Sequence, residues 1–186
     1  MIINTTELQK FFEIMESKNL SFSEIIALIN GKIADNEPLL STDEINLTVD
    51  YNKTPEQAVA DGNYDYKNSG INGKKFPISP EMIGKKVDIA GKLFHFHREI
   101  SSEDAISEMD KKGYRPATLM ELLALGAAHP ELQREFLVIA LGSIWRLSSV
   151  IRCVPCLRVG GSGRELNLRC FGVAWVALDR FFGVRK

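Results

Sequence analysis

The residue usage of this chain changes after Gly142, and this change constrains the fold more than any other feature of the sequence. Between Ile144 and Arg185 there is no lysine, glutamine or methionine, and the only glutamate is Glu165. Lysine and glutamate are among the commonest residues of ordinary domains, so their absence from this stretch needs a cause. We interpret the aromatic, glycine, leucine and arginine residues spaced along the stretch as a structural framework. This framework consists of Trp145, Arg146, Val154, Pro155, Leu157, Gly161, Ser162, Gly163, Arg164, Leu166, Leu168, Phe171, Trp175, Arg180, Phe181, Val184, Arg185 and Lys186.

The composition is that of one globular domain with an extension. The chain has 186 residues, of which 45% are hydrophobic and 25% are charged, and this length can bury one good core. No apolar run reaches the ~18 residues that would suggest a membrane span. The first residues, Met1, Ile2 and Ile3, do not belong to a basic segment followed by an apolar one, which is the pattern of a secretion signal. We therefore expect a cytoplasmic protein.

The net charge of −1 conceals an asymmetry along the chain. The first 112 residues carry 12 lysines and 1 arginine against 19 acidic residues, whereas the residues from Gly113 onward carry 9 arginines and 1 lysine against 5 acidic residues. An arginine-rich surface can bind nucleic acid, which is one alternative function. Arginine beside aromatic and glycine residues more commonly hydrogen-bonds loops or stacks on rings, so we predict structural roles for four of these arginines. They are Arg146, Arg164, Arg180 and Arg185.

The three cysteines do not complete a metal or disulfide pattern. Cys153 and Cys156 have the spacing of a zinc or redox pair, but a zinc site needs a second pair and Cys170 is the only other thiol. Pro155 inside the pair, and the lack of a strand-to-helix pattern around it, argue against a thioredoxin-like motif. An odd number of thiols is also unfavourable for a disulfide framework. We predict that the cysteines are incidental.

The sequence offers no complete cofactor motif. His95 and His97 could place two metal ligands on one face of a strand, but no third ligand is in view and His129 has no matched spacing. The glycine-rich segment at residues 160–163 lacks the lysine and the following helix of a phosphate-binding loop. We therefore expect neither a metal nor another cofactor.

Residues 1–40 have the pattern of a helical N-terminal extension. Thr6-x-x-Gln9 and Ser21-x-x-Glu24 each resemble a capping box that precedes an apolar stripe, and together they predict a helical hairpin. Such stripes are usually packing surfaces. The extension is therefore expected to dock on the domain, to hold a partner, or to associate with a second copy of the chain.

From residue 45 onward, local signals predict strands and helices in turn. The predicted elements are a strand at 45–51, a helix at 55–60 capped by Thr54, a hairpin of strands at 87–89 and 92–97 that turns at Ala90 and Gly91, a helix at 101–112, a helix at 119–128, a buried strand at 136–141, and strands at 154–157 and 166–168 around a turn at 160–163. The sequence thus predicts an α+β fold with a loop-rich and mostly antiparallel C-terminal part.

The framework resembles that of a known family. Its signature is the run Gly113-Tyr114-Arg115-Pro116-Ala117-Thr118 before Leu119-Met120-Glu121-Leu122-Leu123, then Trp145-Arg146, Gly161-Ser162-Gly163-Arg164 and the ending Arg180-Phe181-x-Gly183-Val184-Arg185. This pattern is similar to the variable proteins of diversity-generating retroelements, which have a C-type lectin fold of the formylglycine-generating-enzyme type. The resemblance is strongest over residues 113–186 and implies a lectin-type domain over residues 45–186, with a variable region at about 144–180.

The resemblance also implies a cause for the restricted composition. In such systems a reverse transcriptase misincorporates at template adenines, so asparagine-type codons acquire any first and second base while keeping a pyrimidine at the third. Codons of this form cannot encode lysine, glutamate, glutamine, methionine or tryptophan, so Glu165 is expected to be either fixed or altered by another route. The positions implied to be variable are Ile144, Leu147, Ser148, Ser149, Val150, Ile151, Cys153, Cys156, Arg158, Val159, Gly160, Asn167, Arg169, Cys170, Gly172, Val173, Ala174, Val176, Ala177, Leu178 and Asp179.

The apolar run at residues 173–178 fits either a buried strand or an exposed surface, because hydrophobicity alone does not separate the two. The resemblance implies exposure around Trp175, and hence a non-catalytic binding protein. We expect no calcium, because the sequence lacks a carboxylate-rich sugar-binding loop. Its ligand is expected to be a protein, because a broad changeable surface suits an interface better than a small-molecule pocket. The alternatives are a formylglycine-generating type of enzyme that uses a cysteine pair, and an arginine-rich module that binds nucleic acid.

Overall fold

The computed structural model describes residues 44–186, and the extension predicted at residues 1–40 lies outside them. The described elements are β1 (Ile45–Asp50), α3 (Pro55–Asp61), β2 (Tyr66–Lys67), β3 (Lys86–Phe94), α4 (Ser102–Lys111), β4 (Tyr114–Pro116), α5 (Leu119–Ala128), α6 (Leu132–Glu135), β5 (Val138–Ile139), β6 (Trp145–Arg146), β7 (Arg152–Gly160), β8 (Gly163–Cys170) and β9 (Arg180–Arg185). The fold is therefore α+β, as the sequence predicts.

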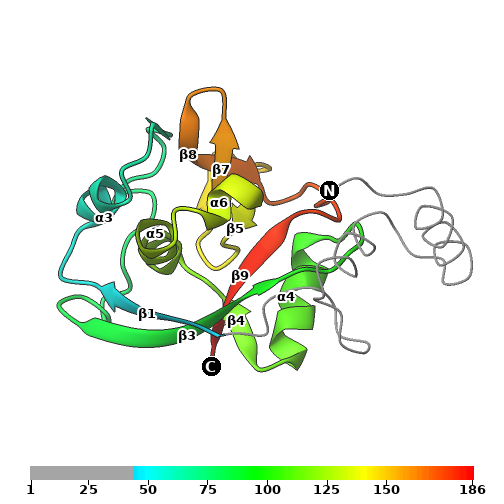
Figure 1. The fold of residues 1–186 in the computed structure, drawn as a ribbon, viewed down its shortest axis with the longest axis horizontal. Helices are drawn as coiled ribbons and strands as arrows, with labels where there is room; N and C mark the ends of the chain where they lie inside the picture. The colour runs from blue at the N-terminus through cyan, green and yellow to red at the C-terminus, as the bar shows by residue number, and fades with distance from the viewer. Residues whose placement is uncertain (1–43) are drawn as a thin grey trace, which may run out of the picture. The chain divides into compact units, whose positions relative to one another are not determined.

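Within the described residues, nine strands form one sheet of order β1-β3-β9-β5-β7-β8-β2, with β4 paired to β9 and β6 paired to β7. The β1–β3 ribbon and the β7–β8 hairpin lie at opposite ends of this order (Figure 1). The pairs β5–β9 and β2–β8 are parallel, and the other pairs are antiparallel. The C-terminal strand β9 thus lies inside the sheet, between β3 and β5.

Helices cover both faces of the sheet. Neighbouring residues of a strand point to opposite faces, and on β9 Phe182 packs into a core cluster with α3 and α5, whereas Phe181 packs into a second cluster with α4. The strand β7 divides in the same way, since Leu157 belongs to the first cluster and Cys156 to the second. The sheet therefore separates two hydrophobic cores.

The three helix predictions that rest on local caps within residues 44–186 are confirmed. The Thr54 hydroxyl accepts a hydrogen bond from the Gln57 amide at the start of α3, and the Ser101 hydroxyl accepts one from the Asp104 amide at the start of α4. At the start of α5, the Glu121 carboxylate accepts the Thr118 amide at 2.7 Å. Each of these contacts satisfies a backbone donor that the helix itself leaves unpaired.

The hairpin predicted to turn at Ala90 and Gly91 is wrong. One continuous strand, β3, runs through both residues, because its first half pairs with β1 and its second half pairs with β9. Gly91 is needed for packing instead. A Cβ atom built there would lie 2.4 Å from Cε2 of Phe182, which is much closer than van der Waals contact allows.

Two further differences lie after Pro130. The short helix α6 was not predicted, and the apolar run at residues 136–141 forms only the two-residue strand β5, although residues 138–141 are all buried. The glycine turn is confirmed, but its flanking strands β7 and β8 are longer than predicted. The run is buried because it crosses the middle of the sheet between β7 and β9.

Candidate functional site

The loop between β8 and β9 is anchored by one buried aromatic residue. Trp175 is 1% exposed, and its indole nitrogen donates a hydrogen bond to the hydroxyl oxygen of Ser102. Its backbone forms an antiparallel bridge with Ile100, with two hydrogen bonds of 2.9 and 3.1 Å. Its ring also packs edge-on against Phe181, with the ring centroids 5.8 Å apart. These contacts fix the middle of the loop to the domain.

The end of this loop is a closed turn. The Val176 amide donates to Oδ2 of Asp179 at 3.0 Å, and the Asp179 amide donates to the Val176 carbonyl at 3.0 Å. Nε2 of His95 lies 2.5 Å from the Ala177 carbonyl oxygen, and the Arg180 guanidinium donates to the Leu178 carbonyl at 2.7 Å. Burial raises the pKa of the Asp179 carboxyl group. The turn is therefore held by backbone and buried polar groups, and the apolar side chains do not take part.

Those apolar side chains point to solvent. Leu178 is 74% exposed, and Val173 and Val176 are exposed as well. The run at residues 173–178 is thus a loop with one buried tryptophan, and it is not a buried strand. Its backbone is fixed, while its other large side chains are 40% to 74% exposed.

A second exposed loop leaves the sheet beside the first. It joins β6 to β7 and is closed by a hydrogen bond from the Leu147 amide to the Ile151 carbonyl at 2.9 Å. Leu147 and Ile151 are exposed, and Val150 is 85% exposed. The bases of the two loops are joined, because the Phe171 amide donates to the Arg152 carbonyl at 2.8 Å and the Arg152 guanidinium lies over the Phe171 ring.

We call the exposed side chains of these two loops the apolar loop surface. It consists of Leu147, Val150, Ile151, Val173, Val176 and Leu178. Both loops lie at the end of the β7–β8 hairpin opposite to its glycine turn, since Cys153 pairs with Cys170 and Gly160 pairs with Gly163. Val159 is also exposed, but it lies near the turn and therefore outside this surface.

The 21 positions implied to be variable differ in burial. Those that are exposed are Ile144, Leu147, Ser148, Ser149, Val150, Ile151, Val159, Arg169, Cys170, Gly172, Val173, Ala174, Val176 and Leu178. Those that are half-buried are Arg158, Gly160, Asn167 and Ala177, and those that are buried are Cys153, Cys156 and Asp179. The side chains of the last three are closed off from solvent and are therefore not part of the exposed surface.

The framework residues are mostly buried. Val154, Pro155, Leu157, Arg164, Leu166, Phe171, Trp175, Arg180, Phe181 and Val184 are buried, Trp145, Gly163 and Leu168 are half-buried, and Arg146, Gly161, Ser162, Arg185 and Lys186 are exposed. Glu165, which departs from the codon rule, is half-buried and forms an ion pair with Arg158 at 3.4 Å.

Three of the four arginines expected to be structural have that role. Arg164 donates to the carbonyl oxygens of Gly62 and Gly126, both at 2.7 Å, and to the side-chain oxygen of Gln133 at 3.0 Å. Arg180 lies over the Phe136 ring at 4.3 Å, and its pKa is lowered to about 10 because the group is desolvated.

Arg185 lies over the Tyr114 ring and pairs with Glu44. The fourth arginine, Arg146, is exposed on β6. Three of these four arginines therefore make contacts within the domain.

The structure brings Cys153 next to Cys170, a pairing that was not predicted from the sequence. Cys153 and Cys156 are three residues apart on one strand, so they point to opposite faces of β7 and do not form a pair. Cys153 lies directly opposite Cys170 on β8. Burial raises the pKa of the Cys156 thiol to about 12. The register of the hairpin, which could have been read from the glycine turn, was the signal available for this pairing.

The histidine pair does not gain a further metal ligand. The rings of His95 and His97 lie 3.5 Å apart between centroids, and Nδ1 of His95 is buried without a hydrogen-bond partner. Desolvation lowers the pKa of His95 to about 4. Within residues 44–186, no group of three or more histidine, cysteine, aspartate or glutamate side chains is arranged to hold a metal ion.

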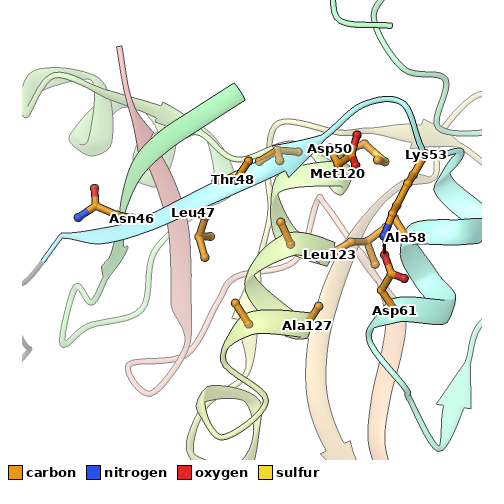
Figure 2. A pocket seen from close by; sticks show the side chains of 13 residues that line it. Asn46, Leu47, Thr48, Asp50, Lys53, Ala58, Asp61, Met120, Leu123 and Ala127 are labelled. Carbon is orange, nitrogen blue, oxygen red and sulfur yellow. Dashed lines mark hydrogen bonds and ion pairs between the residues drawn. The ribbon is translucent and has the colours of Figure 1, made fainter. Parts of the chain in front are cut away.

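A groove of about 440 Å³ lies elsewhere, between β1, α3 and α5 (Figure 2). Leu123, Ala124 and Ala127 of α5 line one side of it, and an ion pair between Lys53 and Asp61, 2.6 Å long, crosses one end. None of the positions implied to be variable lines this groove. The sequence does not predict this groove, because alanines on a helix have no pattern that distinguishes a groove from ordinary packing.

Comparison of the chain with protein-family models, with curated protein sequences and with solved structures gives no match. Among the described residues, no helix combines the length and the apolar character needed to span a membrane.

Proposed function

We propose that this chain is a ligand-binding protein whose C-terminal part displays residues diversified by a retroelement reverse transcriptase. The observation that carries the proposal is the location of the exposed apolar side chains. In the described part of the chain, the exposed large hydrophobic residues are Tyr66, Ile83, Ile144, Leu147, Val150, Ile151, Val159, Val173, Val176 and Leu178. All of them except Tyr66 and Ile83 are positions implied to be variable.

This distribution is difficult to explain by stability. Large apolar side chains that gather on the surface of a soluble domain usually mark an interaction site. The neighbouring framework residues, such as Trp175 and Phe171, are buried and hold the loop backbones. Exposed substitutions usually change the free energy of unfolding by within about 0.5 kcal/mol, so such loops can change sequence without unfolding the domain.

We also propose a fold family for the domain and a cellular location for the protein. We assign the α+β domain to the C-type lectin fold of the formylglycine-generating-enzyme type, on the strength of the framework residues. The protein is proposed to be cytoplasmic, with the residues 1–40 serving self-association or partner docking. The ligand is proposed to be a protein, because the two loops offer a broad surface. The residues of these loops do not line the groove beside α5.

The alternatives receive less support from the geometry. An enzyme that uses a cysteine pair could not use Cys153 and Cys156, because these two lie on opposite faces of β7. Its pair would have to be Cys153 and Cys170, which lie opposite each other on β7 and β8. A nucleic-acid-binding surface would need unengaged arginines, and three of the four framework arginines are engaged, since Arg164 and Arg180 are buried and Arg185 pairs with Glu44. Arg146 and Arg169 are the exposed arginines left to such a surface on β6 and β8.

Population sequencing of this gene and its flanking DNA tests the proposal. We expect codon changes to concentrate at the exposed positions of the two loops, with Trp175 and Phe171 unchanged, and a near-copy of the segment nearby with adenines at the changing sites. Uniform codons and no near-copy would overturn it. A matched comparison is the segment of residues 113–141, which belongs to the same domain and should not vary.

A further inference from the structure

The register of β7 and β8 places Cys153 and Cys170 directly opposite each other in an antiparallel pair. Such pairs alternate along a hairpin between hydrogen-bonded and non-hydrogen-bonded types. The adjacent pair, Arg152 and Phe171, is hydrogen-bonded, because the Phe171 amide donates to the Arg152 carbonyl at 2.8 Å. Cys153 and Cys170 therefore form a non-hydrogen-bonded pair.

The contacts of Pro155 lead to the same assignment. Pro155 lies two residues from Cys153 on β7, and it has no amide hydrogen to donate to β8. Its carbonyl accepts a hydrogen bond from Ala140, which lies on the side of β7 away from β8. Pro155 and Leu168 are thus a non-hydrogen-bonded pair, and Cys153 and Cys170 have the same parity.

This position suits a covalent bond between the strands. The Cα atoms of a non-hydrogen-bonded pair lie about 4.5 Å apart, and its side chains are the closer of the two types. Disulfides span Cα separations from about 4.4 to 6.8 Å. The hairpin backbone therefore already holds the two cysteines within the range of a disulfide.

The surroundings of the two thiols differ in a way that favours an ordered reaction. Cys170 is exposed, so a small reagent can reach it, whereas Cys153 is 8% exposed and has Trp145 opposite it on its other side. Burial raises the pKa of the Cys153 thiol. Cys156 is fully buried on the opposite face of β7, so its thiol cannot pair with Cys153 or Cys170.

We propose that Cys153 and Cys170 form a cross-strand disulfide when the protein meets a low-molecular-weight disulfide such as oxidised glutathione. The Cys170 thiolate attacks one sulfur of the reagent, whose S–S bond breaks and releases one glutathione thiolate. Cys153 then loses its proton and attacks Sγ of Cys170, which releases the second thiolate. The two protons from the cysteines go to the two glutathione thiolates, so two protein thiols are oxidised as one reagent disulfide is reduced.

The bond would join the bases of the two loops that carry the apolar loop surface. Cys153 follows the β6–β7 loop by two residues, and Cys170 directly precedes the β8–β9 loop. The proposed disulfide does not depend on the proposed function, because the hairpin register is present whatever the loops bind.

The test uses the full chain, reduced and then incubated with excess oxidised glutathione. Peptide mass mapping should find a link between Cys153 and Cys170, with Cys156 still a thiol and the protein lighter by two hydrogen atoms. The Cys156→Ser variant should behave identically. The Cys170→Ser variant changes an exposed side chain and should fold, but it should form no intramolecular link.

Three results would overturn the inference. They are an unchanged protein with three thiols, a stable glutathione adduct on Cys170 that Cys153 does not displace, and a link between two chains through Cys170. Each is visible in the wild-type protein, so the conclusion does not depend on the folding of a variant.

Discussion

The indole nitrogen of Trp175 donates a hydrogen bond to the hydroxyl oxygen of Ser102 across 2.8 Å. Ser102 in turn donates to the Phe171 carbonyl at 2.6 Å, so one hydroxyl joins two points of the β8–β9 loop to the first turn of α4. Ser102 and Trp175 are both buried, and water cannot replace either hydrogen bond. The loop thus keeps its shape through groups that a ligand would never touch.

Replacing Ser102 with alanine should destabilise the domain. The change leaves the buried indole N–H without an acceptor, which costs about 1–3 kcal/mol. Urea unfolding should show a lower midpoint for Ser102→Ala than for the wild type. Ser149→Ala, on an exposed loop residue, is the matched control and should unfold like the wild type. Equal midpoints for the two variants would contradict the anchoring role.

Polar substitution of the apolar loop surface should leave the fold intact. Leu147, Val150 and Leu178 are exposed, so changing all three to serine should alter the free energy of unfolding by within about 0.5 kcal/mol per site. Retention on a hydrophobic column should fall, because the exposed apolar area is reduced. Ile83→Ser, an exposed site outside the surface, measures the effect of a single apolar residue. Cooperative unfolding lost in the triple variant would mean that these side chains belong to the core.

Arg164 should be among the residues least tolerant of change. Its guanidinium satisfies the carbonyl oxygens of Gly62 and Gly126, which belong to different parts of the chain. Arg164→Gln removes the charge and shortens the reach, and hydrogen bonds to charged groups contribute about 1.5–3 kcal/mol each. We expect a loss of at least about 3 kcal/mol in urea unfolding. Arg169→Gln, at an exposed position of the same strand, should cost little, and a similar loss for both variants would refute the specific role of Arg164.

Gly91 and Gly161 should respond oppositely to alanine. A Cβ atom at Gly91 would meet the Phe182 ring at 2.4 Å, whereas one at Gly161 would have nothing within 4 Å. Gly91→Ala should therefore destabilise the domain by about 1–3 kcal/mol through overpacking. Gly161→Ala should be close to neutral. Thermal unfolding of the two variants separates a packing glycine from a turn glycine, and equal stabilities of Gly91→Ala and Gly161→Ala would contradict the packing role of Gly91.

The stability of the domain should depend on the protonation of His95. Desolvation lowers the pKa of this histidine from 6.5 to about 4 in the folded protein, so between these values the unfolded chain binds the proton more strongly. The contribution of neutral His95 to the free energy of unfolding is complete above pH 6.5 and is lost as the pH falls toward 4. His95→Gln should flatten this part of the profile of unfolding free energy against pH. An identical slope for wild type and variant would show that His95 does not contribute.

The sequence predicts the parts of this fold that depend on neighbouring residues. The capping residues Thr54, Ser101 and Thr118 mark the starts of the three longest described helices, because a cap acts within one helical turn. The alternation of Leu47 and Val49 with polar residues predicts β1 in the same way. The α+β class follows from these local signals.

The features that the sequence does not predict depend on residues far apart in the chain. Gly91 resembles a turn glycine until β9 places Phe182 against it. The exposure of Val176 depends on the burial of Trp175 against α4, and hydrophobicity cannot distinguish the two cases. Cys170 has no partner in the local sequence, and only the hairpin register brings it opposite Cys153.

The position of β9 inside the sheet has a consequence for the synthesis of the protein. β9 pairs with β3, β4 and β5, yet it follows the exposed loops in the chain. A ribosome must therefore translate residues 144–179 in frame before the sheet can close. Any stop codon or frameshift in that segment removes the strand that joins the two halves of the sheet, so such a product could not form this sheet. Because of this strand order, the sheet can form only when the segment that precedes β9 is translated in frame.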